Sequence, residues 1–348
     1  MKKFYVQWHL LDRCNLRCRH CYQESFSSEK ELSFPELQRI AENLLATMKK
    51  WGARLEVALT GGEPFLKKEL PALLSLLAAS PQVAEISLIT NGLIIPPWVR
   101  ELKAWPKFKE LRISLDGVNA QTNDSIRGPG GWEKAMAGMK KIRELEIPFI
   151  IMFTAMKRNY QEAPGLLELA EATGAKGFII ERFFPLGQGK EWSEEVLSSQ
   201  DFLSLWLQIL GRCGLEAEPE ELIPYRAIKV ELGPKVPQVF GSGCIVGRDG
   251  MALMPDGTVF PCRRLPLAIG NLLAQPLEII WESSDLLKDL RRKDKIKGIC
   301  HLCPVKKCFG CRAMSYVITG DPLAADPHCW LQNLFGLSIH KPGPNEQA

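Results

Sequence analysis

Three cysteines near the N-terminus constrain this chain more than any other feature of its sequence. Cys14, Cys18 and Cys21 are spaced Cys-x3-Cys-x2-Cys and directly follow the apolar run Phe4 to Leu11. Three thiols in one short loop can converge on a single inorganic cluster. Because a four-iron cubane is normally closed by four thiolates, three ligands would leave one iron with an open position, where chemistry can occur. A zinc knuckle or a redox-active thiol set is the alternative, although zinc would want a fourth protein ligand nearby.

The size and charge of the chain argue against several classes of protein. Its 348 residues, 46% of them hydrophobic, suffice for one large α/β domain and a smaller one. The formal net charge of +4 gives no general argument for nucleic acid binding. We find neither a signal peptide pattern nor an apolar run of about 18 residues that suggests a membrane span. We therefore expect a soluble, cytoplasmic protein with no nucleic acid and no membrane partner.

The distribution of the cysteines predicts two separate metal-bearing regions. Eleven cysteines in such a chain favour metal ligation over disulfides, because a reducing compartment keeps thiols free. Three lie between positions 14 and 21, one is alone at 213, and seven fall between 244 and 329. Cys213 matches no motif and is expected to be a core residue on a mostly apolar helix.

Short apolar runs alternate with amphipathic segments through the N-terminal part of the chain. Six runs are predicted strands: Phe4 to Leu11, Leu55 to Thr60, Glu85 to Thr90, Leu111 to Leu115, Phe149 to Ala155 and Gly177 to Phe183. The predicted helices include Pro35 to Lys50, Leu70 to Ala79, Trp132 to Leu145, Gln161 to Thr173 and Glu191 to Gly214. This alternation predicts right-handed crossovers and a parallel sheet, best fitted by an open or partial (β/α)6 barrel of the TIM type. In such barrels the chemistry lies at the C-terminal ends of the strands.

Glycine-rich and polar segments follow several of these strands. Thr60-Gly61-Gly62-Glu63-Pro64 follows the second strand; it could bring the backbone close to a ligand, or it could be an ordinary turn. Asn91 follows the third strand, and Ser114 ends the fourth. Ser114 and the later Arg127 offer a hydroxyl and a guanidinium, which suit a carboxylate ligand.

These residues together closely resemble the signature of the radical S-adenosylmethionine (SAM) enzymes, including the ring of His20 before the last cysteine. In that family SAM fills the open iron, and one electron from the cluster cleaves it to methionine and a 5′-deoxyadenosyl radical. The resemblance implies that Gly61-Gly62-Glu63 holds the methionyl amino group, that Asn91 contacts the ribose, and that Asp116 is structural. The expected cofactor-binding residues are His20, Gly61, Gly62, Glu63, Asn91, Ser114 and Arg127; the expected ligands of the first [4Fe–4S] cluster are Cys14, Cys18 and Cys21.

Beyond residue 243 the pattern changes to short turns and cysteines. Cys244 and Cys262 flank a predicted β-hairpin around Asp256-Gly257, and a helical stretch from Pro276 to Arg292 follows. Cys300-x2-Cys303-x4-Cys308-x2-Cys311 and Cys329 complete the set; in isolation the run of four would suit zinc about as well as iron and sulfur.

The full set of seven resembles the SPASM extension of radical SAM enzymes, which carries two auxiliary [4Fe–4S] clusters. The resemblance implies that Cys244, Cys262 and Cys311 hold the first auxiliary cluster. Cys300, Cys303, Cys308 and Cys329 would then hold the second. The family usually has gaps of five and three where this run has four and two, and no extra cysteine shortly precedes Cys244. The first auxiliary cluster could therefore keep an open iron.

The resemblance covers about residues 4–335 and implies a domain organisation. We expect a radical SAM partial barrel over 1–214, a linker rich in proline, glycine and charge over 215–243, and a C-terminal Cys-rich SPASM domain over 244–335. Residues 336–348 are expected to be a loose tail.

The reaction expected first is oxidation or cross-linking of a side chain in a ribosomally made peptide or protein. A separate leader-binding protein would serve it, because no leader-binding module precedes the first strand. The stretch from Cys311 to Cys329 resembles the tail shared by quinone-cofactor peptide maturases and members of heme and heme d1 synthesis. Radical modification of a tetrapyrrole side chain is therefore the second expectation.

Either reaction implies an external electron donor such as flavodoxin or ferredoxin. A non-catalytic iron–sulfur electron carrier or zinc-bearing interaction module is the third possibility, but it would have little use for Gly61-Gly62-Glu63. No general base can be named from the sequence; Tyr22, Glu181 and Arg182 are candidates near the barrel mouth, and Glu181 and Arg182 could equally form a buried ion pair.

Overall fold

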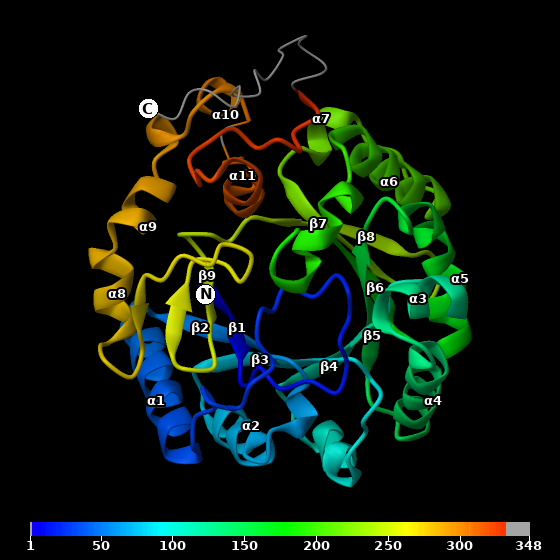
Figure 1. The fold of residues 1–348 in the computed structure, drawn as a ribbon. Helices are drawn as coiled ribbons and strands as arrows, with labels where there is room; N and C mark the ends of the chain where they lie inside the picture. The colour runs from blue at the N-terminus through cyan, green and yellow to red at the C-terminus, as the bar shows by residue number, and fades with distance from the viewer. Residues whose placement is uncertain (1, 306, 332–348) are drawn as a thin grey trace.

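Six parallel strands form the centre of the fold, in the order in which they occur along the chain. They are β1 (Lys2–His9), β2 (Ala53–Thr60), β3 (Val83–Thr90), β4 (Phe108–Ser114), β5 (Phe149–Ala155) and β6 (Gly177–Arg182). The computed structural model, which describes residues 2–305 and 307–331, shows these strands curving around a central space with helices outside them (Figure 1). All six apolar runs predicted from the sequence are confirmed as strands.

The sheet continues beyond both edges of this parallel core. Antiparallel strands extend it after β6, and at the other edge a strand from the cysteine-rich region pairs with β1 in parallel. The added strands are β7 (Tyr225–Glu231), β8 (Gln238–Gly243), β9 (Gly250–Leu253), β10 (Thr258–Phe260) and β11 (Gly270–Asn271). The resulting 11-stranded sheet runs from β11 to β8, and these two edges are not paired with each other. The partial barrel is thus confirmed, and the expected hairpin is the antiparallel pair β9–β10.

Helices cover the outside of the sheet, because both faces of a parallel sheet must be covered. They are α1 (Phe34–Trp51), α2 (Leu70–Ala79), α3 (Ala120–Arg127), α4 (Gly131–Glu144), α5 (Leu166–Thr173) and α6 (Ser199–Arg212). In α1, Ser33 and Glu36 form a capping box, and Gly52 ends the helix in the left-handed conformation. Its buried stripe includes Leu37 and Leu44.

Two long helices expected from the sequence are each divided. The stretch 191–214 contains the end of a 3₁₀ segment (Gly187–Glu195) and then α6, which begins at a capping box made by Ser198 and Asp201. The stretch 276–292 contains α8 (Leu277–Ser283) and α9 (Asp285–Leu290), divided at Ser284, whose hydroxyl accepts from Leu287 N. Local capping therefore overrides the continuous apolar periodicity.

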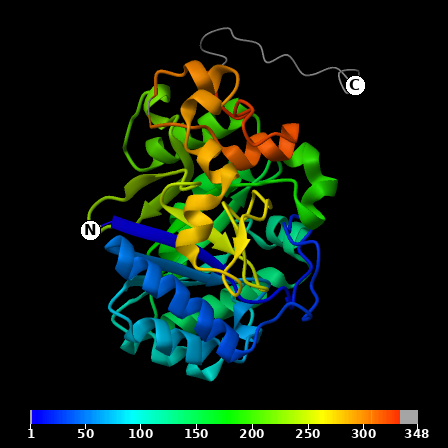
Figure 2. The same ribbon diagram turned by 90° about the vertical axis from the view of Figure 1, so that its left-hand side faces the viewer.

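The stretch predicted as a linker, 215–243, contains α7 (Pro219–Leu222) and the strands β7 and β8 of the main sheet. The cysteine-rich region ends in α10 (Ile299–Leu302) and α11 (Arg312–Thr319), on the same side of the molecule as α7 (Figures 1 and 2). The predicted loose tail, 336–348, lies outside the described residues. No helix in the described part of the chain is long and apolar enough to cross a bilayer.

Candidate functional site

The three-cysteine loop lies at the C-terminal ends of the parallel strands, beside a cavity with about 1000 Å³ of space including its open mouth. Residues from β2, β3, β4 and β5 reach the same cavity, as the strand-end rule predicts. All predicted residues of the first cluster and SAM site except Glu63 line it: Cys14, Cys18, His20, Cys21, Gly61, Gly62, Asn91, Ser114 and Arg127.

The two glycines after β2 pack directly against the backbone that enters the cysteine loop. Gly62 N donates to Leu11 O at 2.9 Å, and Glu63 N donates to Arg13 O at 2.9 Å. A Cβ on Gly62 would stand 2.0 Å from Arg13 O, and Gly61 has a φ of +142°. Only glycine fits these positions without moving the loop.

The Glu63 carboxylate is fully buried and faces the protein, not the cavity. It accepts from Thr90 Oγ1 at 2.8 Å, from Asn91 N at 2.9 Å and from Phe65 N at 3.1 Å. Burial raises the pKa of Glu63 to about 7, although these hydrogen bonds act in the opposite direction. In this structure Glu63 joins the ends of β2 and β3 and orients Asn91. The side-chain Nδ2 of Asn91 donates to Asn15 Oδ1 at 2.7 Å.

Asp116 connects two residues of the expected cofactor site. Its Oδ2 lies 2.7 Å from Arg127 Nη2 and 3.0 Å from His20 Nε2. Burial alone would raise the pKa of Asp116, but the charges of Arg127 and His20 hold it far below its usual range. Asp116 therefore positions a guanidinium and an imidazole beside the cysteine loop. Arg127 Nε and His20 Nδ1 have no hydrogen-bond partner among the described residues.

The thiols of the three-cysteine loop are shielded from water in part, and this burial affects their protonation. All three are half-buried, and burial raises the pKa of Cys18 to about 12 and also raises that of Cys21. Without a metal they stay protonated, whereas a metal ligand must be a thiolate. No group of three His, Cys, Asp or Glu side chains within 2–305 and 307–331 is arranged to hold a single metal ion. Three thiols beside an open cavity are a donor set that suits a larger inorganic cluster with one externally filled position.

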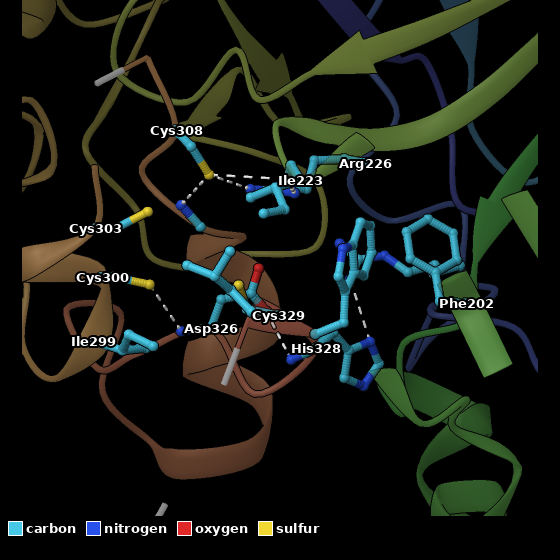
Figure 3. A pocket seen from close by; sticks show the side chains of 14 residues that line it. Phe202, Ile223, Arg226, Ile299, Cys300, Cys303, Cys308, Asp326, His328 and Cys329 are labelled. Atoms are coloured by element: carbon cyan, nitrogen blue, oxygen red, sulfur yellow. Dashed lines mark hydrogen bonds between the residues drawn. The ribbon is translucent and has the colours of Figure 1, made fainter. Parts of the chain in front are cut away.

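The seven C-terminal cysteines lie in two places in the structure. Cys311 is buried in one hydrophobic cluster, and Cys244 and Cys262 are partly buried and pack against that cluster. A second, smaller cavity, with about 430 Å³ of space, is lined by the other four (Figure 3). These four are Cys300, Cys303, Cys308 and Cys329.

Two arginines donate to thiols in this second cavity region, the half-buried Arg226 and the buried Arg312. Arg226 Nη2 lies 3.0 Å from Cys308 Sγ (Figure 3), and its Nη1 donates to Ile223 O and Tyr225 O. Arg312 Nη2 lies 3.9 Å from Cys300 Sγ. Hydrogen bonds and positive charge near cluster sulfurs stabilise the reduced state. Arg226 was not predicted as a site residue, because it falls in the stretch that resembles a linker.

Glu181 and Arg182, at the end of β6, do not form the ion pair considered from the sequence. Glu181 pairs with Arg264, which lies two residues beyond Cys262, and both line the larger cavity. Tyr22 also lines this cavity, and burial raises its pKa to about 12, so that it stays protonated at neutral pH. Thr154, at the end of β5, was missed as a lining residue although the strand-end rule points to it.

The comparisons with known proteins agree with this geometry. Residues 8–170 match the Radical SAM superfamily model, and residues 244–304 match an iron-sulfur cluster-binding domain, SPASM. The AdoMet-dependent heme synthase of Methanosarcina barkeri is 30% identical over 353 residues, covering 97% of each chain. The pre-heme d1 synthase of Dinoroseobacter shibae is 29% identical, covering 94% of this chain and 86% of the relative. A solved structure of anSMEcpe with bound AdoMet and a Cp18Cys peptide has a TM-score of 0.72 at 18% identity, covering 96% of each chain.

These matches confirm the fold class, the enzyme class and the cofactors predicted from the sequence, SAM and [4Fe–4S] clusters. The likeness to solved structures at this low identity concerns the fold. The chain belongs to the radical SAM superfamily and carries a C-terminal SPASM domain that binds auxiliary iron–sulfur clusters.

Proposed function

We propose that this enzyme uses SAM to modify a side chain of a tetrapyrrole, the second of the two reactions expected from the sequence. The observation that carries this proposal is the 30% identity, over 97% of both chains, to a protein named AdoMet-dependent heme synthase. A pre-heme d1 synthase with 94% of this chain covered adds to it.

The SAM site in this proposal is built from the polar residues around the three-cysteine loop. When bound, SAM and the cluster supply a 5′-deoxyadenosyl radical that abstracts a hydrogen atom from the substrate. The backbone at Gly61 and Gly62 would receive the amino group, and Asn91 would contact the ribose. Arg127, fixed by Asp116, would bind the carboxylate together with Ser114. Glu63 would hold the glycine loop in place.

The substrate would occupy the end of the cavity formed by β6 and its following residues. Phe183, Phe184 and Tyr22 line that end, and Arg264 and Arg182 add positive charge beside them. Aromatic faces suit a flat macrocycle, and guanidinium groups suit its propionates. Residues buried around the cavity exclude water from the reacting carbon.

The auxiliary clusters in this proposal follow the two groups of thiols. Cys244, Cys262 and Cys311 would hold the first, and Cys300, Cys303, Cys308 and Cys329 the second. Both would exchange electrons with the substrate side, and an external donor such as flavodoxin or ferredoxin would reduce the first [4Fe–4S] cluster. We keep 1–214 and 244–335 as the proposed domains; the intervening 215–243 would contribute Arg226 to the second auxiliary site.

The test is the transfer of a label from substrate into SAM-derived product. Anaerobically reconstituted enzyme is given SAM, a strong reductant, and separately a deuterated tetrapyrrole fraction and a deuterated peptide fraction. We expect deuterium in 5′-deoxyadenosine with the tetrapyrrole fraction only, and none with Cys14→Ala/Cys18→Ala/Cys21→Ala. Deuterium transfer from the peptide fraction alone would replace our proposal with the peptide reaction.

A further inference from the structure

Arg182, the last residue of β6, forms part of the wall between the two cavities. It lines both the larger cavity at the three-cysteine loop and the smaller one around Cys300, Cys308 and Cys329, shown in Figure 3. Among the residues that the structure describes, it alone lines both of these cavities. Its side chain is almost fully buried, with 2% exposed. A buried guanidinium requires acceptors, because it keeps its charge in any protein environment.

One edge of this guanidinium has no protein acceptor. Arg182 Nη1 lies 3.2 Å from His328 Nδ1, and the guanidinium carbon lies 4.8 Å from the centre of the Phe202 ring. Nε and Nη2 have no hydrogen-bond partner among the described residues. The N–H groups of these two nitrogens lie along one edge of the planar guanidinium and point in parallel, which is the geometry that binds both oxygens of a carboxylate.

The neighbouring charges leave this edge available. Glu181, the adjacent acid, pairs with Arg264. Asp326, the nearby acid whose pKa Arg182 helps to lower, accepts hydrogen bonds from the backbone N–H groups of Cys311 and His328.

We propose that Arg182 binds a carboxylate of the substrate through its Nε and Nη2 edge, in the larger cavity. With the tetrapyrrole substrate on which this inference rests, the carboxylate is a propionate. Phe183 and Phe184, which follow Arg182 and line the same cavity, would then contact the ring. Because Arg182 is fixed by a strand, by His328 and by Phe202, a propionate bound there would fix the orientation of the macrocycle.

The experiment measures porphyrin binding to the full-length, reconstituted enzyme without reductant, by absorbance titration. The probes are iron coproporphyrin III, which carries propionate side chains, and its methyl ester. We expect Arg182→Gln to weaken binding of the acid by about tenfold or more, since a charge-assisted bidentate contact is lost. Arg182→Lys keeps the positive charge but not the paired N–H groups, so its affinity for the acid is expected to lie between those of the wild type and Arg182→Gln.

The methyl ester is expected to bind the wild type weakly and to be unaffected by Arg182→Gln. Arg158→Gln is the matched control: this arginine pairs with Glu195, stacks on Trp192 and does not line either cavity. We expect it to bind the acid like the wild type.

Two results would overturn the carboxylate site. Equal affinity of the wild type for acid and ester is the first, and unchanged binding of the acid by Arg182→Gln is the second. If the second is accompanied by a changed spectrum of the auxiliary clusters in Arg182→Gln, the free edge faces a cluster in the smaller cavity. Both results leave the tetrapyrrole reaction standing, whereas failure of both porphyrins to bind the wild type would overturn both proposals.

Discussion

The two cysteine regions of this protein differ in what surrounds their thiols. Cys14, Cys18 and Cys21 come from one loop, are half-buried, and face the larger cavity. The C-terminal cysteines come from positions 244 to 329, and among the four that line the smaller cavity, Cys300 and Cys308 are buried and contact arginines. In the proposed function, the first arrangement would leave room for an external ligand at the metal, whereas the four cysteines of the smaller cavity would supply protein atoms instead. A site for chemistry and a site for holding electrons would thus differ in their ligand count and in their neighbours.

The largest effect expected from this comparison is the loss of SAM cleavage when the first region alone is removed. Cys14→Ala/Cys18→Ala/Cys21→Ala is expected to reduce release of 5′-deoxyadenosine to background, because no cluster remains to reduce SAM, while iron at the C-terminal cysteines stays bound. Chromatographic quantification of 5′-deoxyadenosine and iron analysis check this. Full SAM cleavage by the triple variant would remove the distinction between the regions.

The next largest effect is expected where the backbone at Gly62 packs against the cysteine loop of the first region. Gly62→Ala is expected to weaken SAM binding by about tenfold or more, because its Cβ would meet Arg13 O at 2.0 Å and displace the cysteine loop. Equilibrium dialysis with labelled SAM measures it. Gly211→Ala is the matched control, since a Cβ there meets nothing within 4 Å and the residue lies in α6. Equal SAM affinity of the two variants would show that the glycine loop is not part of the SAM site.

Each region has a buried carboxyl group nearby, and the contributions of the two groups to stability change with pH in opposite directions. Glu63, near the first region, accepts only from uncharged groups in its three hydrogen bonds, and burial raises its pKa to about 7. The folded state therefore holds a proton that the unfolded state releases above about pH 4.5, and stability is lost as the pH rises toward 7. Asp326, near the second region, has its pKa lowered by Arg226 and Arg182 against the effect of burial, and contributes stability that is lost at low pH.

Between about pH 4.5 and 7, we expect the free energy of unfolding of the wild type to fall by about 3 kcal/mol more than that of Glu63→Gln. Denaturant unfolding of metal-free protein at several pH values measures it. A wild type and a Glu63→Gln variant with parallel pH profiles would mean that the carboxylate is not buried as described.

Arg226 is expected to set the reduction potential of the cluster in the second region. Arg226→Gln is expected to lower the reduction potential of the second auxiliary cluster by about 60 mV, a tenfold change for a one-electron couple, because a cationic donor to Cys308 is lost. Arg226→Lys should lower it less. Redox titration followed by electron paramagnetic resonance (EPR) checks both, and equal potentials in all three proteins would show that the contact with Cys308 does not tune the cluster.

The smallest effect is expected at the cysteine that belongs to neither region. Cys213 is buried at the end of α6, within the main hydrophobic core. Cys213→Ala should leave iron content and SAM cleavage unchanged and lower the free energy of unfolding by about 1 kcal/mol. A loss of iron from this variant would mean that a metal site had been overlooked.

The sequence predicts the first region better than the second, for physical reasons. Gly61 and Asn91 follow strands, and Ser114 ends one. Because the ends of parallel strands meet at one edge of a sheet, the cavity could be inferred from short-range patterns. The contact of Glu181 with Arg264 joins residues far apart in the sequence and depends on the pairing of β9 with β1. Arg226 lies on β7, in a segment whose proline and glycine content resembles a linker. Long-range strand pairing of this kind leaves no local signal.

The most direct measurement is the EPR spectrum of the reduced enzyme with and without SAM, in the wild type and in the triple variant of Cys14, Cys18 and Cys21. The account predicts that one cluster signal of the wild type changes when SAM is added, that this signal is absent from the triple variant, and that the remaining signals do not respond to SAM. A wild-type spectrum in which no signal responds to SAM, or a triple variant that retains the responsive signal, would contradict it.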